Sequence, residues 1–113
     1  MADAFERSDP DTATGLVNDY LRGRNLEQLG RVDDAIPLYE GAVHNAFDST
    51  GPYDRLIHIY ASTAQHSEVI RVCDAALRSV HTYEDKRTWY ARVRADAEQA
   101  TQALPRAAPR RRE

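Results

Sequence analysis

The stretch LGRVDDAIPLYEGAV, residues 29–43, combines a helix end, a helix start and an apolar helical stripe. Gly30 suits the left-handed conformation that closes a helix. The acidic pair at 33–34 suits the free amides of a first helical turn. The apolar residues that follow recur every three or four positions, as on one face of a helix: Ala35, Tyr39 and Ala42. The stretch therefore predicts a helix that ends near residue 30 and a second that starts near residue 33.

The same pattern returns 34 residues later. The first copy carries Gly23, Leu26, Gly30, Ala35, Tyr39 and Ala42 where the second carries Ile57, Tyr60, Ala64, Val69, Cys73 and Ala76. A period between about 20 and 50 residues is typical of stacked units, none of which covers its apolar face alone. The period predicts two repeats, at residues 16–49 and 50–83.

Apolar spacing and turn residues over the whole chain predict five helices, four in the two repeats and one after them. The first starts near Thr12, the third near Pro52 after the turn at 48–52, and Ser67 is placed to cap the fourth. Thr82 and Asp85 resemble a capping box that opens a terminal helix over about 83–104, which Pro105 closes. The fold prediction is all-α, with antiparallel helices. A flexible acidic arm is predicted at 1–11, a helical domain at 12–104 and a disordered Arg-rich tail at 105–113.

Composition favours one small globular domain. The chain has 113 residues, of which 42% are hydrophobic and 29% charged. Residues 1–50 carry ten acids and four arginines (net −6), and residues 51–113 carry eight acids and eleven bases (net +3). A single cysteine excludes an internal disulfide and favours the cytoplasm. No apolar run approaches the roughly 20 residues that span a bilayer, so no membrane partner is expected.

The motifs of catalysis and metal binding are missing from the sequence. His58 and His66 lie eight residues apart, as do Cys73 and His81, whereas ligand pairs on a helix need a spacing of three or four. Cys73 lies on an apolar stripe, which predicts a buried structural thiol. We therefore expect no catalytic residue, no cofactor and no metal.

The chain resembles the tetratricopeptide repeat (TPR) family over about residues 16–83. Gly23 matches the small site where the two helices of a unit cross, Gly30 the turn, and Tyr39 the aromatic packing site. The second copy departs from the family at Ile57, Ala64, Val69 and Cys73. The resemblance implies a solenoid of antiparallel helix pairs, here two units and a capping helix. It also implies a protein-interaction module without catalysis.

By resemblance, the first helices of successive units line a concave groove that takes a peptide or a partner helix. Basic residues recur there at one repeat position, and aromatic residues flank them; the candidate partner-binding residues are Tyr20, Arg24, Arg55, His58, Trp89 and Arg92. Arginine forks suit carboxylates, so an acidic segment or a C-terminal carboxylate is the expected partner. The alternative is that the arginines pair internally with Asp19, Glu27, Asp54 and Asp96, and that Trp89 packs in the core.

Two further functions stay open. The end of the array at Leu16–Tyr20 has no obvious cap in the sequence, which favours a self-associating structural protein, a homodimer. The arginines of the tail offer a weak, salt-sensitive contact with nucleic acid: Arg106, Arg110, Arg111 and Arg112. Because no aromatic residues are interleaved with them, this last function is the least favoured.

Overall fold

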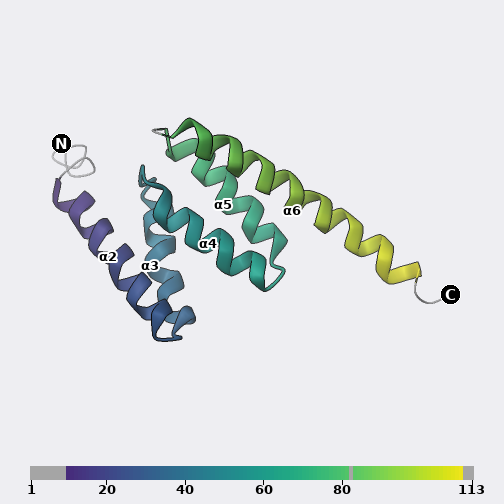
Figure 1. Cartoon of the computed structure of the whole chain (residues 1–113), viewed down its shortest axis with the longest axis horizontal. Coiled ribbons are helices and arrows are strands. Elements are labelled where there is room, and N and C mark those ends of the chain that lie inside the picture. The colour runs from purple at the N-terminus through teal and green to yellow at the C-terminus, as the bar shows by residue number, and fades with distance from the viewer. Residues whose placement is uncertain (1–9, 82, 111–113) are drawn as a thin grey trace.

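The computed structural model describes residues 10–81 and 83–110 and confirms the all-α prediction (Figure 1). These residues form five helices and no strand: α2 (Pro10–Gln28), α3 (Val32–His44), α4 (Thr50–Ser62), α5 (His66–Ser79) and α6 (Glu84–Arg110). The first nine residues of the predicted arm, and Thr82 of the predicted capping box, lie outside the described residues.

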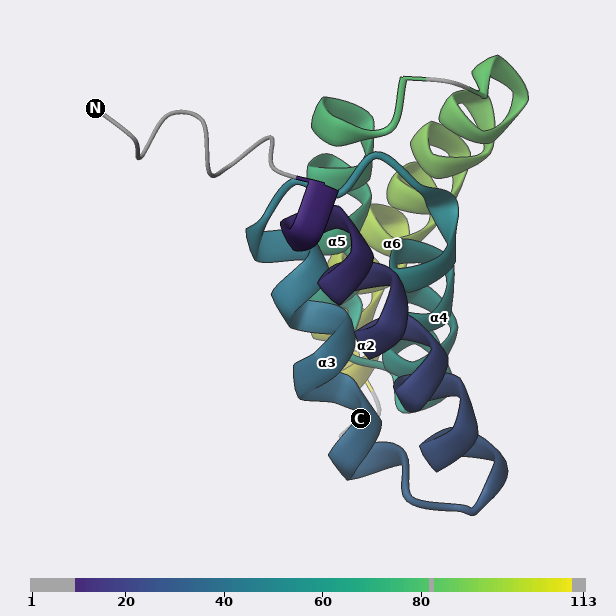
Figure 2. The same ribbon diagram turned by 90° about the vertical axis from the view of Figure 1, so that its left-hand side faces the viewer.

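Each helix packs mainly against its neighbours in the chain, α2 on α3, α3 on α4, α4 on α5 and α5 on α6. In Figure 2, α3 and α5 lie on the left, α4 and α6 lie on the right, and α2 is nearest the viewer. Side-chain contacts also join the alternate helices α2, α4 and α6. Tyr20 of α2 contacts Gly51 of α4, and the Tyr90 hydroxyl of α6 donates a hydrogen bond to Asp54 of α4. The molecule is elongated, 62 × 31 × 28 Å.

The turns that close α2 and α4 have the same geometry, one repeat apart. Gly30 has a φ of 78°, and Ala64, 34 residues later, has a φ of 58°. After Gly30, the Arg31 N–H donates to the Leu26 carbonyl at 2.8 Å. The equivalent bond after Ala64 joins the amide of residue 65 to the carbonyl of residue 60 at 2.9 Å. The predicted left-handed turn is therefore confirmed at Gly30, and it recurs where the second copy has alanine.

The core also follows the period. Residues at matching positions of α3 and α5 are all buried: Ala35 and Val69, Tyr39 and Cys73, Ala42 and Ala76. A β-carbon at Gly23 would lie 2.6 Å from Cε1 of Tyr39, so only glycine leaves room for this ring. The second unit carries Ile57 and Cys73 at these two positions, both buried. Ile57 is larger than Gly23, its equivalent in the first unit, and Cys73 is smaller than Tyr39, its equivalent there. The two departures therefore compensate in volume.

Three helix boundaries differ from the predictions. Helix α2 starts at Pro10, inside the predicted arm, and α6 continues to Arg110, so the prediction that Pro105 ends it is wrong. A proline within a helix removes one backbone hydrogen bond and bends the axis, which need not end the helix. Ser67 does not cap α5, because that helix begins at His66 and the N-cap residue is Gln65, without a side-chain cap bond.

Candidate partner-binding face

A carboxylate of α2 joins the first three helices. Glu27 accepts a hydrogen bond from the Tyr39 hydroxyl of α3 at 2.6 Å. It also accepts from Nε of Arg55 at 2.8 Å and from Nη2 at 2.6 Å, a two-pronged contact with α4. The hydrogen bond from Arg55 is the main reason why the pKa of Glu27 lies below its usual value. We call such a carboxylate, with its tyrosine and its cation, a carboxylate latch.

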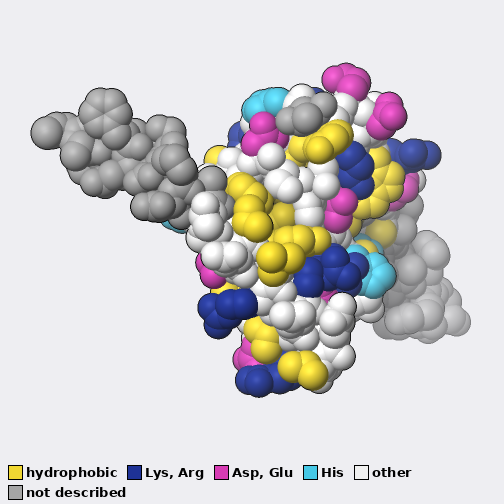
Figure 3. All heavy atoms as spheres, turned by 60° about the vertical axis from the view of Figure 1, so that its left-hand side comes forward, with side chains coloured by type: hydrophobic (Ala, Val, Ile, Leu, Met, Phe, Trp, Pro, Cys, Tyr) yellow, Lys and Arg dark blue, Asp and Glu magenta, His cyan; other side chains and the backbone are white. Residues whose placement is uncertain are grey.

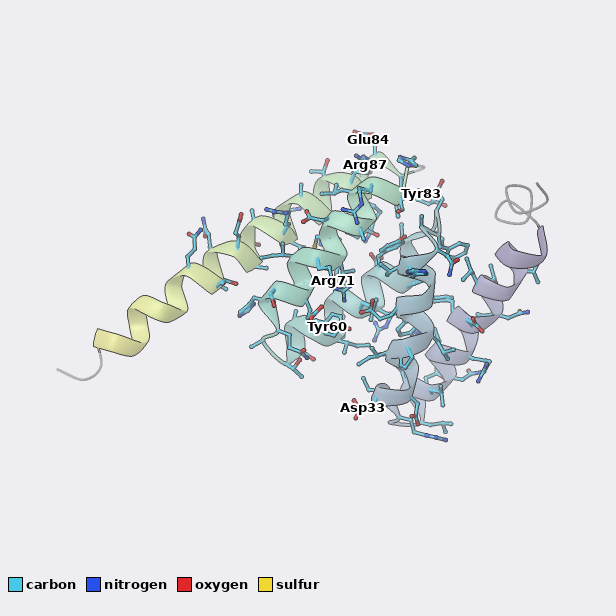
Figure 4. The ribbon with its side chains drawn as sticks, turned by 180° about the vertical axis from the view of Figure 1, so that it is seen from behind. Asp33, Tyr60, Arg71, Tyr83, Glu84 and Arg87 are labelled. Atoms are coloured by element: carbon cyan, nitrogen blue, oxygen red, sulfur yellow. The ribbon has the colours of Figure 1, made fainter. Side chains whose placement is uncertain are left out.

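A second carboxylate latch joins α3, α4 and α5. Glu40 accepts from the Tyr60 hydroxyl at 2.5 Å and from Nη2 of Arg71 at 2.7 Å. Figure 4 shows Tyr60 and Arg71 close together where these helices meet. Arg71 also donates from Nε to Glu68 at 2.7 Å. Both latches tie a carboxylate of one helix to a tyrosine of the next helix and an arginine of the one after.

A third carboxylate latch joins α4 to α6. Asp54 accepts from the Tyr90 hydroxyl at 2.8 Å and lies 3.0 Å from the Lys86 ammonium. The predicted alternative of internal pairing is therefore confirmed for Arg55, which binds Glu27. At two of the other three carboxylates the cation differs from the predicted one, since Lys86 faces Asp54 and Arg22 lies 3.9 Å from Asp19. Asp96 forms no ion pair among the described residues.

The two aromatic candidates also make internal contacts. The ring of Tyr20 lies 6.0 Å from that of Tyr39 and reaches the backbone at Gly51. Trp89 is half-buried, packs against the core, and has the Lys86 ammonium 4.0 Å from its ring centroid. A cation at this distance from an indole face is attracted by the π-system. Tyr20 and Trp89 thus support the framework, and both residues remain partly exposed.

The three remaining candidates have basic side chains at the surface. We call these residues, Arg24, His58 and Arg92, the basic row. They stand at one repeat position on α2, α4 and α6. His58 and Arg92 are exposed, and Arg24 is half-buried, with one hydrogen bond to the Tyr20 hydroxyl at 3.2 Å. Among the described residues, none of the three forms an ion pair with a carboxylate. The guanidinium groups of Arg24 and Arg92 and the imidazole of His58 are therefore left for a ligand to contact.

Apolar side chains are exposed beside the basic row, and the sequence prediction did not include them. Val17 and Leu21 of α2 are 42% and 53% exposed. They lie four residues apart, hence on the same side of the helix. Figure 3 shows hydrophobic side chains gathered on this face of the molecule, next to basic ones and a histidine. The spacing of Val17, Leu21 and Arg24 already placed them on one side of a helix. Helical periodicity alone, however, does not distinguish an exposed apolar stripe from a buried one.

The outer surface of α2 is polar where the matching surface of α4 is buried. Pro52, Leu56 and Ile59 of α4 are buried. One repeat earlier, the residues at these positions are exposed and polar: Asn18, Arg22 and Asn25. Polar residues on the outer face are typical of a terminal unit in a repeat array. This surface therefore has the character of a cap that the sequence prediction did not find at the Leu16–Tyr20 end.

The described residues were also searched for reactive and membrane-spanning features. Cys73 is fully buried, and burial raises the pKa of its thiol to about 11, which makes it a poor nucleophile. Among the described residues, no three His, Cys, Asp or Glu side chains gather as metal ligands would. No helix in that part of the chain has the length and apolar character needed to cross a membrane.

No family model, curated protein or solved structure matches this chain. The resemblance to TPR proteins thus depends on the residues quoted above.

Proposed function

We propose that the chain is a TPR-like protein-interaction module without catalysis, and that it binds an acidic segment of a partner protein across α2, α4 and α6. In this proposal two helix pairs form the repeats and α6 caps them. The recurrence of turn hydrogen bonds and of buried positions at a spacing of 34 residues supports the repeat assignment.

The basic row is the single observation that carries the binding proposal. Three basic side chains at one repeat position have no carboxylate partner among the described residues, whereas Arg55 and Lys86 nearby are neutralised by Glu27 and Asp54. A row of basic groups spaced by the repeat, two of them arginines, suits a chain of carboxylates and gives it a direction. Exposed apolar groups beside the row, Val17 and Leu21, add a surface that is buried on binding.

The proposal is tested with a fluorescein-labelled peptide rich in aspartate and glutamate, and with a lysine-rich peptide of equal length. We expect the acidic peptide alone to bind, and the double variant Arg24→Glu/Arg92→Glu to weaken it about tenfold or more. The matched control is Arg22→Glu/Arg78→Glu, which makes the same change of net charge at exposed arginines outside the basic row. Equal weakening by the two double variants would contradict the proposal, because it would mean that only net charge matters.

A second candidate function, self-association, is favoured by the same exposed pair on α2, Val17 and Leu21. A homodimer through this stripe would bury both side chains. Sedimentation velocity over a range of protein concentrations distinguishes the two functions. A sedimentation coefficient that rises with concentration in the native chain, and not in Leu21→Glu, would support the dimer.

A further inference from the structure

An apolar hollow of about 180 Å³ lies where the end of α4 and the start of α5 meet the side of α6. Its apolar lining consists of small and β-branched side chains: Ala61, Val69, Val93, Ala97 and Ala100. His66 and Asp96 are the polar residues that border it. In Figure 1, α6 continues past the ends of α4 and α5.

The hollow lies next to the basic row. On α4, Ala61 comes three residues after His58, and on α6, Asp96 comes four residues after Arg92. Residues three or four apart are neighbours on one side of a helix. A segment bound across the basic row at His58 and Arg92 therefore lies within one helical turn of the hollow.

We propose that this hollow takes one bulky apolar side chain of the partner, such as leucine, methionine or phenylalanine, next to the carboxylates that the basic row binds. This inference rests on the proposed function and adds the anchor residue of the partner segment. An engineered apolar cavity of roughly 150 Å³ holds a benzene molecule, so a hollow of about 180 Å³ has room for one such side chain. Apolar anchors in a pocket carry much of the affinity of peptide interfaces.

Charge favours an acidic segment of another protein as the occupant. Arg92 lies one helical turn from the hollow on α6, and His58 lies one turn from it on α4. Asp96 stands on the border of the hollow itself. The carboxylates of an acidic segment are therefore complementary to the basic row, and an apolar side chain of the same segment is suited to the hollow beside Asp96.

The hollow is first tested alone, with benzene as an apolar probe followed by amide chemical shifts in the full chain. We expect benzene to shift the amides of Val69, Val93 and Ala97, and Ala100→Leu to abolish these shifts by filling the hollow. The matched control is Ala95→Leu, the same substitution at an exposed position of α6. Ala61→Leu fills the hollow from α4 and gives a second variant should Ala100→Leu alter the folding of α6.

The anchor is then tested with two labelled acidic peptides that differ only in a central leucine or alanine. We expect the leucine peptide to bind about tenfold more tightly. The difference should disappear in Ala100→Leu and Ala61→Leu and persist in Ala95→Leu. A difference unchanged by the filling variants, or no difference at all, overturns the inference. If Arg24→Glu/Arg92→Glu still weakens both peptides, the proposed function survives that result; if it weakens neither, or if neither peptide binds, the proposed function fails as well.

Discussion

The contact between Gly23 and Tyr39 allows a stability prediction with a worked magnitude. A β-carbon at Gly23 would lie 2.6, 2.9 and 3.2 Å from three carbons of the Tyr39 ring. The ring is fully buried and its hydroxyl is held by Glu27 at 2.6 Å, so it has little room to retreat. Overpacking of this kind costs about 1–3 kcal/mol. Alanine is a better helix former than glycine by about 1 kcal/mol, which offsets part of that cost.

We therefore expect Gly23→Ala to destabilise the chain by up to about 2 kcal/mol, which is up to about 8 °C in Tm for a domain of this size. Gly41→Ala is the matched control, because a β-carbon there would have no neighbour within 4 Å. In α3 this change should raise the free energy of unfolding by up to about 1 kcal/mol. Both values are measured by thermal and urea denaturation followed by circular dichroism.

A double-mutant cycle tests whether the ring is the cause. In a Tyr39→Cys background, which copies the second unit, Gly23→Ala should no longer destabilise, giving a coupling free energy of about 2 kcal/mol. The reasoning would be refuted if Gly23→Ala stabilised the native chain as much as Gly41→Ala does. It would also be refuted if its cost were unchanged once the Tyr39 ring had been removed.

Further predictions concern the turns, the carboxylate latches and the thiol. Ala64→Gly should raise the free energy of unfolding by about 0.5–1 kcal/mol, because Ala64 is held at positive φ. Gly30→Ala should lower it by about 1 kcal/mol for the same backbone reason, since a β-carbon there meets no neighbour. Equal effects of the two changes in urea titrations would contradict this. The pKa of Glu27 is lowered in the folded chain, so its contribution to stability is present above the unfolded value near 4.5 and is lost as pH falls through the folded one. Glu27→Gln should remove that part of the acid dependence in denaturation curves measured from pH 6 downward. Burial raises the pKa of Tyr39, so stability should fall as pH rises above about 10. The tyrosinate absorbance of Tyr39, taken as the difference between the native chain and Tyr39→Phe, should appear only together with unfolding. Cys73 should react with a thiol reagent at the rate of global unfolding; rapid labelling of the native chain would exclude its burial.

The repeat was predictable from the sequence because its signals are local. Gly30 and the acidic pair at 33–34 set a turn and a helix start, and the structure has both, one residue from the expected helix start. The departures at Ile57 and Cys73 looked independent in the sequence. They become one feature only when Gly23 and Tyr39 are seen in contact. The sequence shows that each of these residues is larger or smaller than its equivalent, but not that the two positions face each other across a helix crossing.

The candidate face was harder to predict because its side chains choose partners far along the chain. Arg55 meets Glu27 from 28 residues away, and Asp54 receives Tyr90 from 36 residues away. The sequence offered several carboxylates to each arginine, and spacing alone did not select among them. The hollow beside Ala61 and Ala97 was not predicted at all, since it depends on how α6 lies across the ends of two other helices.

The order in which the helices touch has a kinetic consequence. Because each helix rests on the segment just before or after it, most contacts close short loops, and a chain of low contact order is expected to collapse to its native topology within milliseconds or faster. The same arrangement favours local unfolding that begins at the end of the array. Once the hydrogen bonds between Glu27 and Arg55 break, helix α2 can unfold while the other helices stay packed. Amide hydrogens near Leu26 should therefore exchange earlier than those near Val72.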